Sequence, residues 1–250
     1  MDIRLIVATH KPYWMPEDDM YLPLHVGHFS KKDIGLLGDD TGDHISVKNA
    51  NYCELTGLYW AWKNLKAEYL GLVHYRRHFS ISSKGDRKQR VLTKKQAETL
   101  LKRSDIILPK PRNYFIETNY SQYAHAHHAI DLDTTRKILS EKYPAYLNEF
   151  DASMKRTIGH RFNMFIMKRN LFDAYCAWLF DILFELERRL DISTYSVNDA
   201  RVFGFVSERL LDVWLGANGF SYVEIPCLFL EKQNWQKKAF LFLKRKFTKA

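Results

Sequence analysis

Short apolar runs alternate with amphipathic segments along the chain, and this alternation predicts strands and helices in turn. Residues 3–9 form an apolar run rich in branched side chains that ends in the polar sequence His10-Lys11-Pro12, as a buried strand does where it enters a loop. Similar runs predict further strands at 21–26, 69–74, 105–108, 162–167 and 222–225.

Helical periodicity fills the segments between these runs. Within residues 47–65, the apolar side chains of Tyr52, Leu55, Tyr59 and Trp62 recur at spacings of three and four, which places them on one face of a helix. The same pattern predicts helices at 93–102, 171–189 and 196–215. Residues 83–90 predict an exposed loop, and the tyrosine- and histidine-rich residues 119–133, which show no clean period, predict a partly helical loop at a binding site.

Strands that alternate with helices favour an α/β fold, in which a mostly parallel central sheet is flanked by helices. The chain shows no internal repeat, low-complexity segment or linker. We therefore expect one domain over residues 1–235, followed by a separate tail at 236–250.

Charge narrows the classes of partner. The 250 residues carry a formal net charge of +9, which calls for an anionic partner such as nucleic acid, anionic lipid or the phosphates of a nucleotide sugar. The tail at 236–250 interleaves lysine and arginine with phenylalanine and leucine, a pattern typical of a helix on an anionic membrane surface. Elsewhere the basic residues are spread out and no nucleic-acid reader motif occurs, so we do not expect nucleic acid as the partner.

The absence of a membrane-spanning run and the cysteine usage both favour an intracellular protein. No run approaches the roughly 18 apolar residues of a membrane span, and the N-terminus lacks a signal-peptide cleavage region. We expect a cytoplasmic protein, peripheral at the inner face of the membrane. The cysteines Cys53, Cys176 and Cys227 are odd in number and far apart, which predicts buried free thiols.

The most unusual polar group is His74-Tyr75-Arg76-Arg77, which lies at the end of a predicted strand. Adjacent guanidinium groups repel each other unless an anion or carboxylates lie between them, and arginine forks match phosphate oxygens in pairs. The group therefore predicts a site for a diphosphate, with His74, Arg76 and Arg77 as ligands. A solvated basic corner paired with acidic side chains is the structural alternative.

A second cluster combines aromatic and imidazole side chains and comprises Tyr120, Tyr123, His125, His127 and His128. Zinc is disfavoured there, because adjacent histidines cannot easily turn both rings to one ion and no cysteine or HExxH motif accompanies them. Imidazoles that bind sugar hydroxyls, beside tyrosines on which sugars stack, give the functional interpretation. Ordinary packing is its rival.

Carboxylates are candidates for a general base, the group that accepts a proton from a reacting hydroxyl. The candidates lie in a glycine-containing loop, near the start of the first long helix and on the late helix: Asp39, Asp40, Asp43, Glu54, Asp199 and Glu208. The only Asp-x-Asp triplet, at 131–133, precedes a predicted helix, so helix capping is its expected task rather than metal binding.

Long stretches of the chain resemble the bacterial capsular and exopolysaccharide biosynthesis proteins that were catalogued as a domain of unknown function and are now regarded as glycosyltransferases. The matching stretches are GDDTGDHISVKNANYCELTGLYWAWKN, YLGLVHYRRHF, ILPKPRNYFIETNYSQYAHAHH, FNMFIMKRNLFDAYCAWLFDILFELE and DARVFGFVSERLLDVWL. The resemblance implies a single Rossmann-like, GT-A-like domain that uses a nucleotide-diphosphate sugar, of the UDP-galactose or UDP-galactofuranose type. It also implies that Asn163 faces the sugar. Residues 74–77 occupy the position of the metal motif in the wider fold, which puts metal dependence in doubt.

From these observations we expect a hexosyltransferase that acts on a lipid-linked oligosaccharide. Asp199 or Glu208 is expected as the base, and Asn163 and the tyrosine and histidine cluster are expected as sugar ligands. We expect no metal cofactor, with manganese or magnesium as the alternative. The expected donor ligands are Thr9, His10, Lys11, Asp40, Asp43, Asn51, His74, Arg76 and Arg77. A nucleic-acid-binding protein and a non-catalytic scaffold of a polysaccharide assembly complex are the alternatives.

Overall fold

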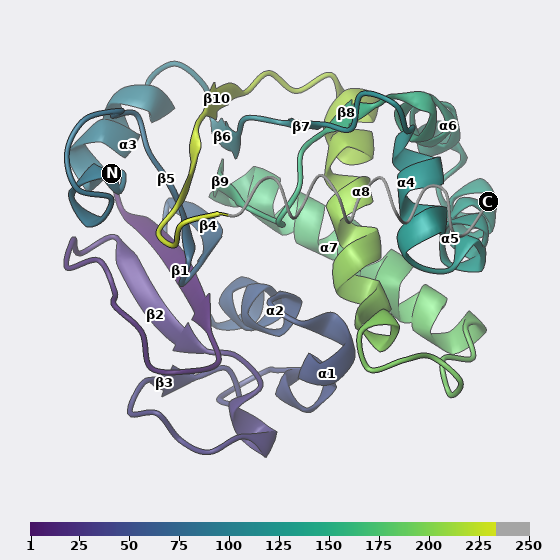
Figure 1. Ribbon diagram of the computed structural model, residues 1–250, viewed down its shortest axis with the longest axis horizontal. Helices are drawn as coiled ribbons and strands as arrows, with labels where there is room; N and C mark the ends of the chain where they lie inside the picture. Colours follow the sequence, from purple (N-terminus) through teal and green to yellow (C-terminus); the bar gives the residue numbers. More distant parts are fainter. Residues whose placement is uncertain (234–250) are drawn as a thin grey trace.

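A seven-strand path forms the centre of the molecule in the computed structural model, which describes residues 1–233 (Figure 1). Its order is β10-β6-β9-β4-β1-β2-β3. The bounds of these strands are β1 Ile3–Thr9, β2 Tyr21–His25, β3 Leu37–Gly38, β4 Tyr69–His74, β6 Ile106–Pro109, β9 Phe165–Lys168 and β10 Val223–Ile225.

The pairing of these strands is mostly parallel. Strand β1 runs parallel to both β2 and β4, and the register pairs Ala8 with His74, so these strands end at the same edge of the sheet. Strand β9 is the exception within the path, because it runs antiparallel to both β4 and β6. Two short antiparallel strands, β5 (Arg77–Phe79) and β11 (Cys227–Phe229), extend the sheet beyond β4, and β7 (Arg112–Asn113) pairs with β8 (Ile158–Gly159) in a separate sheet.

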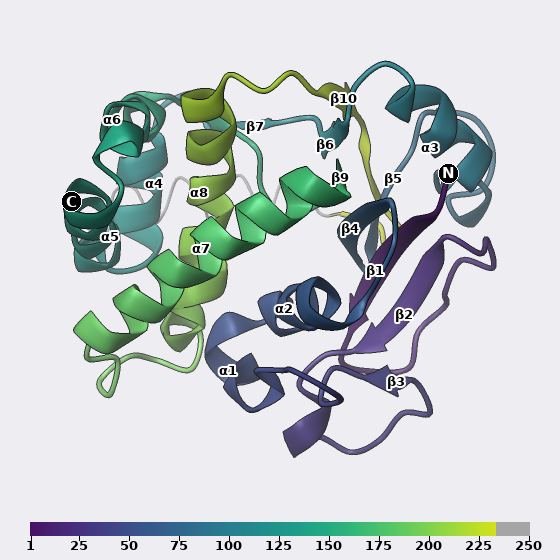
Figure 2. The same cartoon turned by 180° about the vertical axis from the view of Figure 1, so that it is seen from behind.

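Apolar side chains on β1 alternate between the two faces of the sheet, as the period of a strand requires. Ile6 and Ala8 belong to one buried cluster, whereas Leu5 and Val7 belong to the other. The first cluster packs under α2 and α7, and the second under α3 (Figures 1 and 2). Helices therefore cover both faces, and the predicted α/β fold with a largely parallel central sheet is confirmed.

The helices divide into those that cover the sheet and those that pack beside it. In both views α4, α5 and α6 gather at the end of the molecule away from the sheet, with α7 and α8 between them and the strands (Figures 1 and 2). The bounds are α1 Asn49–Tyr52, α2 Leu55–Asn64, α3 Lys94–Leu101, α4 Asn119–Ala126, α5 Ala129–Lys142, α6 Leu147–Lys155, α7 Arg169–Arg189 and α8 Val202–Asn218. Short 3₁₀ segments lie at His28–Ser30, Ser46–Lys48, Lys88–Arg90, Pro144–Tyr146 and Asp199–Arg201.

Backbone geometry changes two of the elements expected from periodicity. The helix expected over 47–65 is interrupted at Cys53, whose φ of 52° and ψ of −129° lie outside the helical region. The strand expected over 162–167 begins only at Phe165, because Phe162 and Asn163 have φ values of 79° and 53° and make a turn instead. Both predictions were wrong at these residues, since hydropathy carries no information on the sign of φ.

The segment 119–133 is more regular than expected. It forms α4 and the start of α5 rather than a partly helical loop. Thr118 begins α4 with a capping box: its hydroxyl accepts the backbone N–H of Ser121, and the Ser121 hydroxyl accepts the N–H of Thr118. The periodicity was obscured because α4 buries tyrosine and asparagine rather than aliphatic side chains.

The predicted membrane-binding tail at 236–250 lies outside the described residues. Among the helices that the structure describes, none combines the length and the apolar composition needed to cross a bilayer.

A buried histidine in β5 predicts a dependence of stability on pH. His78 is fully buried against the edges of Trp14 and Tyr21, and this burial lowers its pKa to about 4. In the unfolded chain an imidazole has a pKa of about 6.5, so the unfolded state takes up the proton first and stability falls as the pH drops from about 6.5 toward 4. We expect His78→Phe to reduce the loss of unfolding free energy between pH 7.5 and 5 by about 2 kcal/mol.

Chemical denaturation at the two pH values measures this effect. Above pH 7.5 the ring is neutral in both states, so the difference between variant and wild type should there be independent of pH, which provides the internal control. An equal pH dependence in the two proteins would show that His78 is not buried in neutral form.

Candidate functional site

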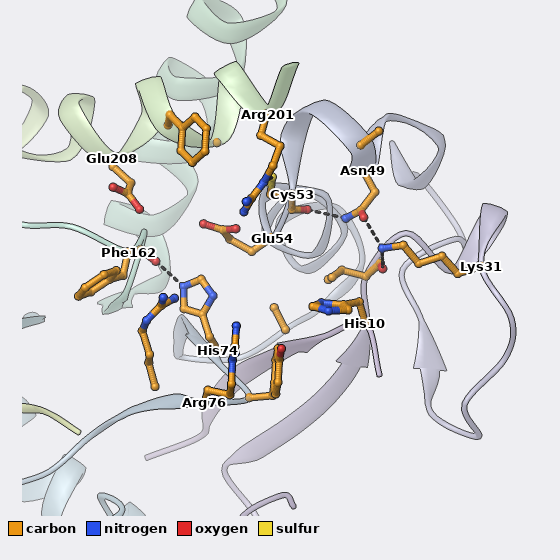
Figure 3. Close-up of a pocket in the computed structure, with 17 residues that line it drawn as sticks. His10, Lys31, Asn49, Cys53, Glu54, His74, Arg76, Phe162, Arg201 and Glu208 are labelled. Carbon is orange, nitrogen blue, oxygen red and sulfur yellow. Dashed lines mark hydrogen bonds between the residues drawn. The ribbon is translucent and has the colours of Figure 1, made fainter. Parts of the chain in front are cut away.

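A cavity of ≈ 590 Å³ opens where β1 and β4 end. The parallel register brings the chain that follows each strand to the same edge of the sheet, which is where open α/β sheets bind ligands. His10 follows β1, and His74 at the end of β4 leads into Arg76 and Arg77. In Figure 3 these strand ends face the junction of α1 and α2 and the first turns of α8, with side chains from both sides pointing into the same space.

Positive side chains without carboxylate partners dominate the cavity. Among the residues that the structure describes, Lys31, Arg77 and Arg201 line it and form no ion pair. The Arg77 guanidinium lies 4.6 Å from the centre of the Phe162 ring, and Nε of Arg201 donates to Sγ of Cys53 at 3.1 Å. Nζ of Lys31 donates to the carbonyl of Val26 at 3.0 Å.

The charges of the cavity also act on its histidine. The pKa of His10 lies below its ordinary value, because of burial first and then because of the nearby charges of Lys31, Lys11, Arg76 and Arg201. Burial likewise lowers the pKa of Lys31. The part of the His10 shift that comes from four nearby cations shows that positive charge gathers beside this ring, and such charge attracts anions.

Arg76 differs from its neighbour because one carboxylate lies within reach. Its Nη1 is 3.3 Å from Oε2 of Glu231, and each of the two side chains is 42% exposed. The Arg76 guanidinium also stacks 4.9 Å from the centre of the Tyr75 ring. An exposed ion pair of this kind contributes little stability, so an incoming anion displaces it at small cost.

Two carboxylates, Glu54 and Glu208, share the cavity with these cations (Figure 3). Nδ2 of Asn163 donates to Oε1 of Glu54 at 2.8 Å and to the carbonyl of Gly204 at 3.2 Å, while the Ser207 hydroxyl donates to Oδ1 of Asn163 at 2.9 Å. The Glu54 carboxylate is therefore held from the side opposite the cavity by a buried amide.

Strained backbone surrounds the Glu54 carboxylate. Cys53, Phe162 and Asn163 all have positive φ, a conformation that costs free energy for side chains other than glycine. Such strain clusters at functional sites, where the surrounding packing enforces it. Here it sets Glu54 and Asn163 opposite each other although they are 109 positions apart in sequence.

His74 lies at the floor of the cavity. Its Nε2–H donates to the carbonyl of Phe162 at 2.5 Å, which fixes the tautomer of the neutral ring. The pKa of His74 is lowered, because burial disfavours the charged form. A neutral ring in this place leaves the positive charge of the cavity to lysine and arginine.

Several donor ligands expected from the sequence lie outside the cavity. Asp40 pairs with His28 at 2.8 Å, Asp43 accepts from the Tyr59 hydroxyl at 3.1 Å, and Asn51 donates to the carbonyl of Ala200 at 2.7 Å. Their side chains are thus used within the fold. Thr9 does not line the cavity either, but its hydroxyl donates to the carbonyl of Lys11 at 2.7 Å and shapes the loop that carries His10. Nζ of Lys11 lies 5.5 Å from the centre of the Tyr75 ring.

The tyrosine and histidine cluster is occupied by internal carboxylate contacts. The hydroxyl of Tyr120 donates to Asp133 and that of Tyr123 to Asp131, while His125 pairs with Glu117. Asp199 accepts from His127 at 3.0 Å and lies 3.9 Å from His128. Neither Asp199 nor any member of this cluster lines the cavity, whereas Asn163 stands directly behind Glu54.

Two cations of the cavity, Lys31 and Arg201, were absent from the ligands expected from sequence. One signal pointed to Arg201. It immediately precedes the N-terminus of a helix, where the helix dipole disfavours a cation unless an anion binds nearby. Lys31 gave no such signal, because it follows a short 3₁₀ turn in a loop with no regular pattern.

Comparison with known proteins places the chain in a family and beside one solved structure. Residues 4–219 match the family described as Domain of unknown function (DUF4422). The apo structure of the bifunctional glycosyltransferase WbbM is similar to this chain with a TM-score of 0.87 and 30% sequence identity over 93% of the chain. The chain spans 46% of the length of that protein. No curated protein matches the sequence.

Proposed function

The chain belongs to the DUF4422 family, as its resemblance to polysaccharide-biosynthesis proteins led us to expect, and from this premise we propose that it is a glycosyltransferase of bacterial polysaccharide synthesis. The reaction class is supported by the similar structure of WbbM, which is a glycosyltransferase. WbbM is bifunctional, and the part of it that matches this chain, 46% of its length, is large enough to hold one of its two active sites. The donor is a nucleotide-diphosphate sugar and the acceptor a saccharide.

The observation that carries this proposal is the cavity with unpaired cations at the carboxyl edge of the sheet. Arg77, Arg201 and Lys31 approach it from three separate parts of the chain. Guanidinium and ammonium groups left without carboxylates suit a diphosphate, whose charge grows as the glycosidic bond to the sugar breaks. The same groups take the place of a divalent cation, so we propose transfer without a metal cofactor.

Catalysis also needs a group that accepts the proton of the acceptor hydroxyl. We assign this role to Glu54, with Glu208 as the second candidate, because both carboxylates line the cavity and Glu54 is oriented by Asn163. In an inverting transfer the hydroxyl oxygen bonds to the anomeric carbon, the nucleoside diphosphate leaves with the electron pair of the broken bond, and the proton passes to the carboxylate.

The remaining assignments define substrate and location. The loop from Thr9 to Lys11 would hold the nucleotide, and a galactosyl or galactofuranosyl unit from a UDP donor would be transferred to a lipid-linked oligosaccharide. Such an acceptor would place the enzyme at the inner face of the membrane, where the basic segment 236–250 would contact anionic lipid. The tyrosine and histidine cluster would then reach the acceptor only beyond the rim of the cavity.

A thermal-shift screen against nucleotide sugars tests the function. We expect UDP-hexoses at 100 times their dissociation constant to stabilise the fold by about 3 kcal/mol, and the sugar that gives the largest shift to be the donor. Incubation of this donor with a lipid-linked acceptor, in buffer without added divalent metal, should yield the extended product by mass spectrometry.

Each alternative function predicts a different result when oligonucleotide binding is measured beside the nucleotide-sugar screen. Binding of oligonucleotides that weakens steeply with salt, together with no response to any nucleotide sugar, would favour a nucleic-acid-binding protein. No response to either class of ligand would favour a non-catalytic scaffold.

A further inference from the structure

Three potential metal ligands converge at the end of β2, outside the cavity described above. His25 is the last residue of this strand, His28 opens the following 3₁₀ turn, and Asp33 lies in the loop beyond it. One ligand atom from each residue lies within 4.8 Å of those from the other two. Nε2 of His28 is 3.6 Å from Oδ1 of Asp33.

His25 has no hydrogen-bond partner for either ring nitrogen, although its side chain is fully buried. A buried polar atom without a partner costs free energy, and such atoms are rare in folded proteins. The His25 ring meets the His28 ring edge to face, with their centres 5.0 Å apart. A ligand that both rings share would satisfy one of the unpartnered nitrogens of His25.

A carboxylate behind His28 orients its ring toward this point. Oδ2 of Asp40 is 2.8 Å from Nδ1 of His28. Because a carboxylate accepts a hydrogen bond, Nδ1 carries a proton, and Nε2 is the nitrogen available to a metal ion on the side of Asp33. Histidines that bind metals are commonly oriented in this way by a carboxylate on the other ring nitrogen.

We propose that His25, His28 and Asp33 bind one zinc ion. Two imidazoles and one carboxylate form a ligand set that zinc favours over magnesium or calcium, which prefer oxygen ligands. Ligand atoms about 2.1 Å from a tetrahedral zinc ion lie about 3.4 Å from one another, so the His28–Asp33 pair needs only a small movement of an exposed side chain. Water would complete the coordination.

The zinc site differs from the catalytic site proposed above and does not depend on it. None of its three ligands lines the cavity. The ion would instead tie the loop at residues 26–36 to the end of β2, and this loop carries Lys31, whose Nζ also bonds Oδ1 of Asn49 at 2.5 Å. Zinc binding itself needs no donor site, and under the proposed function the role of the ion would be to hold Lys31, a cation of that site, in place.

Zinc uptake by the full, tag-free chain tests the site. We expect elemental analysis after dialysis against micromolar zinc chloride to find one zinc per chain, and saturating zinc to raise Tm by about 5 °C or more. Asp33→Asn should weaken zinc binding at least tenfold, and Asp40→Asn by about 10- to 100-fold through loss of the orienting carboxylate. His25→Phe should abolish uptake.

Asp191→Asn is the matched control. In Asp33 and Asp191 alike, an exposed carboxylate accepts the backbone N–H two residues further along the chain, from Gly35 at 2.8 Å and from Ser193 at 3.0 Å. An asparagine keeps that hydrogen bond, so the control should bind zinc as the wild type does. Less than 0.1 zinc per wild-type chain, or equal zinc affinity in the wild type, Asp33→Asn and Asp191→Asn, would overturn the proposal.

Discussion

Replacing Arg77 with glutamine should lower kcat/KM for the sugar donor by about 100-fold or more, the largest loss that we expect from one cation of the cavity. Removal of one partner from a desolvated charge pair costs about 3 kcal/mol, and each 1.4 kcal/mol corresponds to a factor of ten. Arg77 packs against Phe162 and has no ion-pair partner among the described residues, so its loss leaves no carboxylate of the protein uncompensated. The variant should therefore fold.

Arg136→Gln provides the matched control for this experiment. Arg136 forms a two-pronged ion pair with Asp151 at 2.7 Å on the surface of α5, outside the cavity. Its loss should leave kcat/KM within about a factor of two, because exposed ion pairs contribute little. The kcat/KM of Arg77→Lys should lie between the values of these two variants, since lysine keeps the positive charge but lacks the planar guanidinium that binds two phosphate oxygens at once. Equal activity of Arg77→Gln and the wild type would exclude Arg77 from the diphosphate site.

Glu54→Gln should lower kcat by about 100- to 10,000-fold while the thermal shift with the donor is retained. An amide has nearly the shape of the carboxylate but cannot accept a proton from the acceptor hydroxyl. Because donor binding depends on the cations of the cavity and not on this proton transfer, binding and turnover should separate. Single-turnover transfer with saturating donor and acceptor measures the effect.

The same substitution at two other carboxylates discriminates between candidate bases. Glu208→Gln should reduce kcat less than Glu54→Gln, and Asp199→Asn should have the smallest effect, because Asp199 lies outside the cavity beside His127. A larger loss in Glu208→Gln than in Glu54→Gln would transfer the role of base to Glu208. Asn163→Ala, which removes a positioning residue, should lower kcat while the thermal shift with the donor is retained, because the Glu54 carboxylate loses the amide that orients it.

Local sequence patterns predicted the centre of the sheet well. Strands β1 and β4 begin and end where their apolar runs do, because both are buried on two faces and flanked by polar loops. The position of Arg76 and Arg77 beside a cavity at the end of β4 was likewise accessible, since the end of a parallel strand is a property of the strand itself.

Long-range contacts explain why the rest of the site was missed. Glu54 meets Asn163 across 109 positions, and Arg201 meets Cys53 across 148. Each pair depends on a turn with positive φ, at Asn163 in the first pair and at Cys53 in the second. The turn at Cys53 packs against Gly204 of α8, with Cβ and Sγ of Cys53 each 3.4 Å from the place that a Cβ would take at that glycine.

The sequence by itself determined the α/β class, the central strands, the excess of positive charge and one arginine pair at a strand end, because each of these follows from neighbouring residues or from composition. Only the tertiary structure decided which polar groups share the cavity and which form hydrogen bonds or ion pairs with other residues of the fold. Asp40, Asp199 and His125 resembled ligands in sequence but have partners within the fold, whereas Lys31 and Arg201 gained a role from the packing of distant loops. The partner of a charge is set by distance in space, and one sequence alone does not specify that distance.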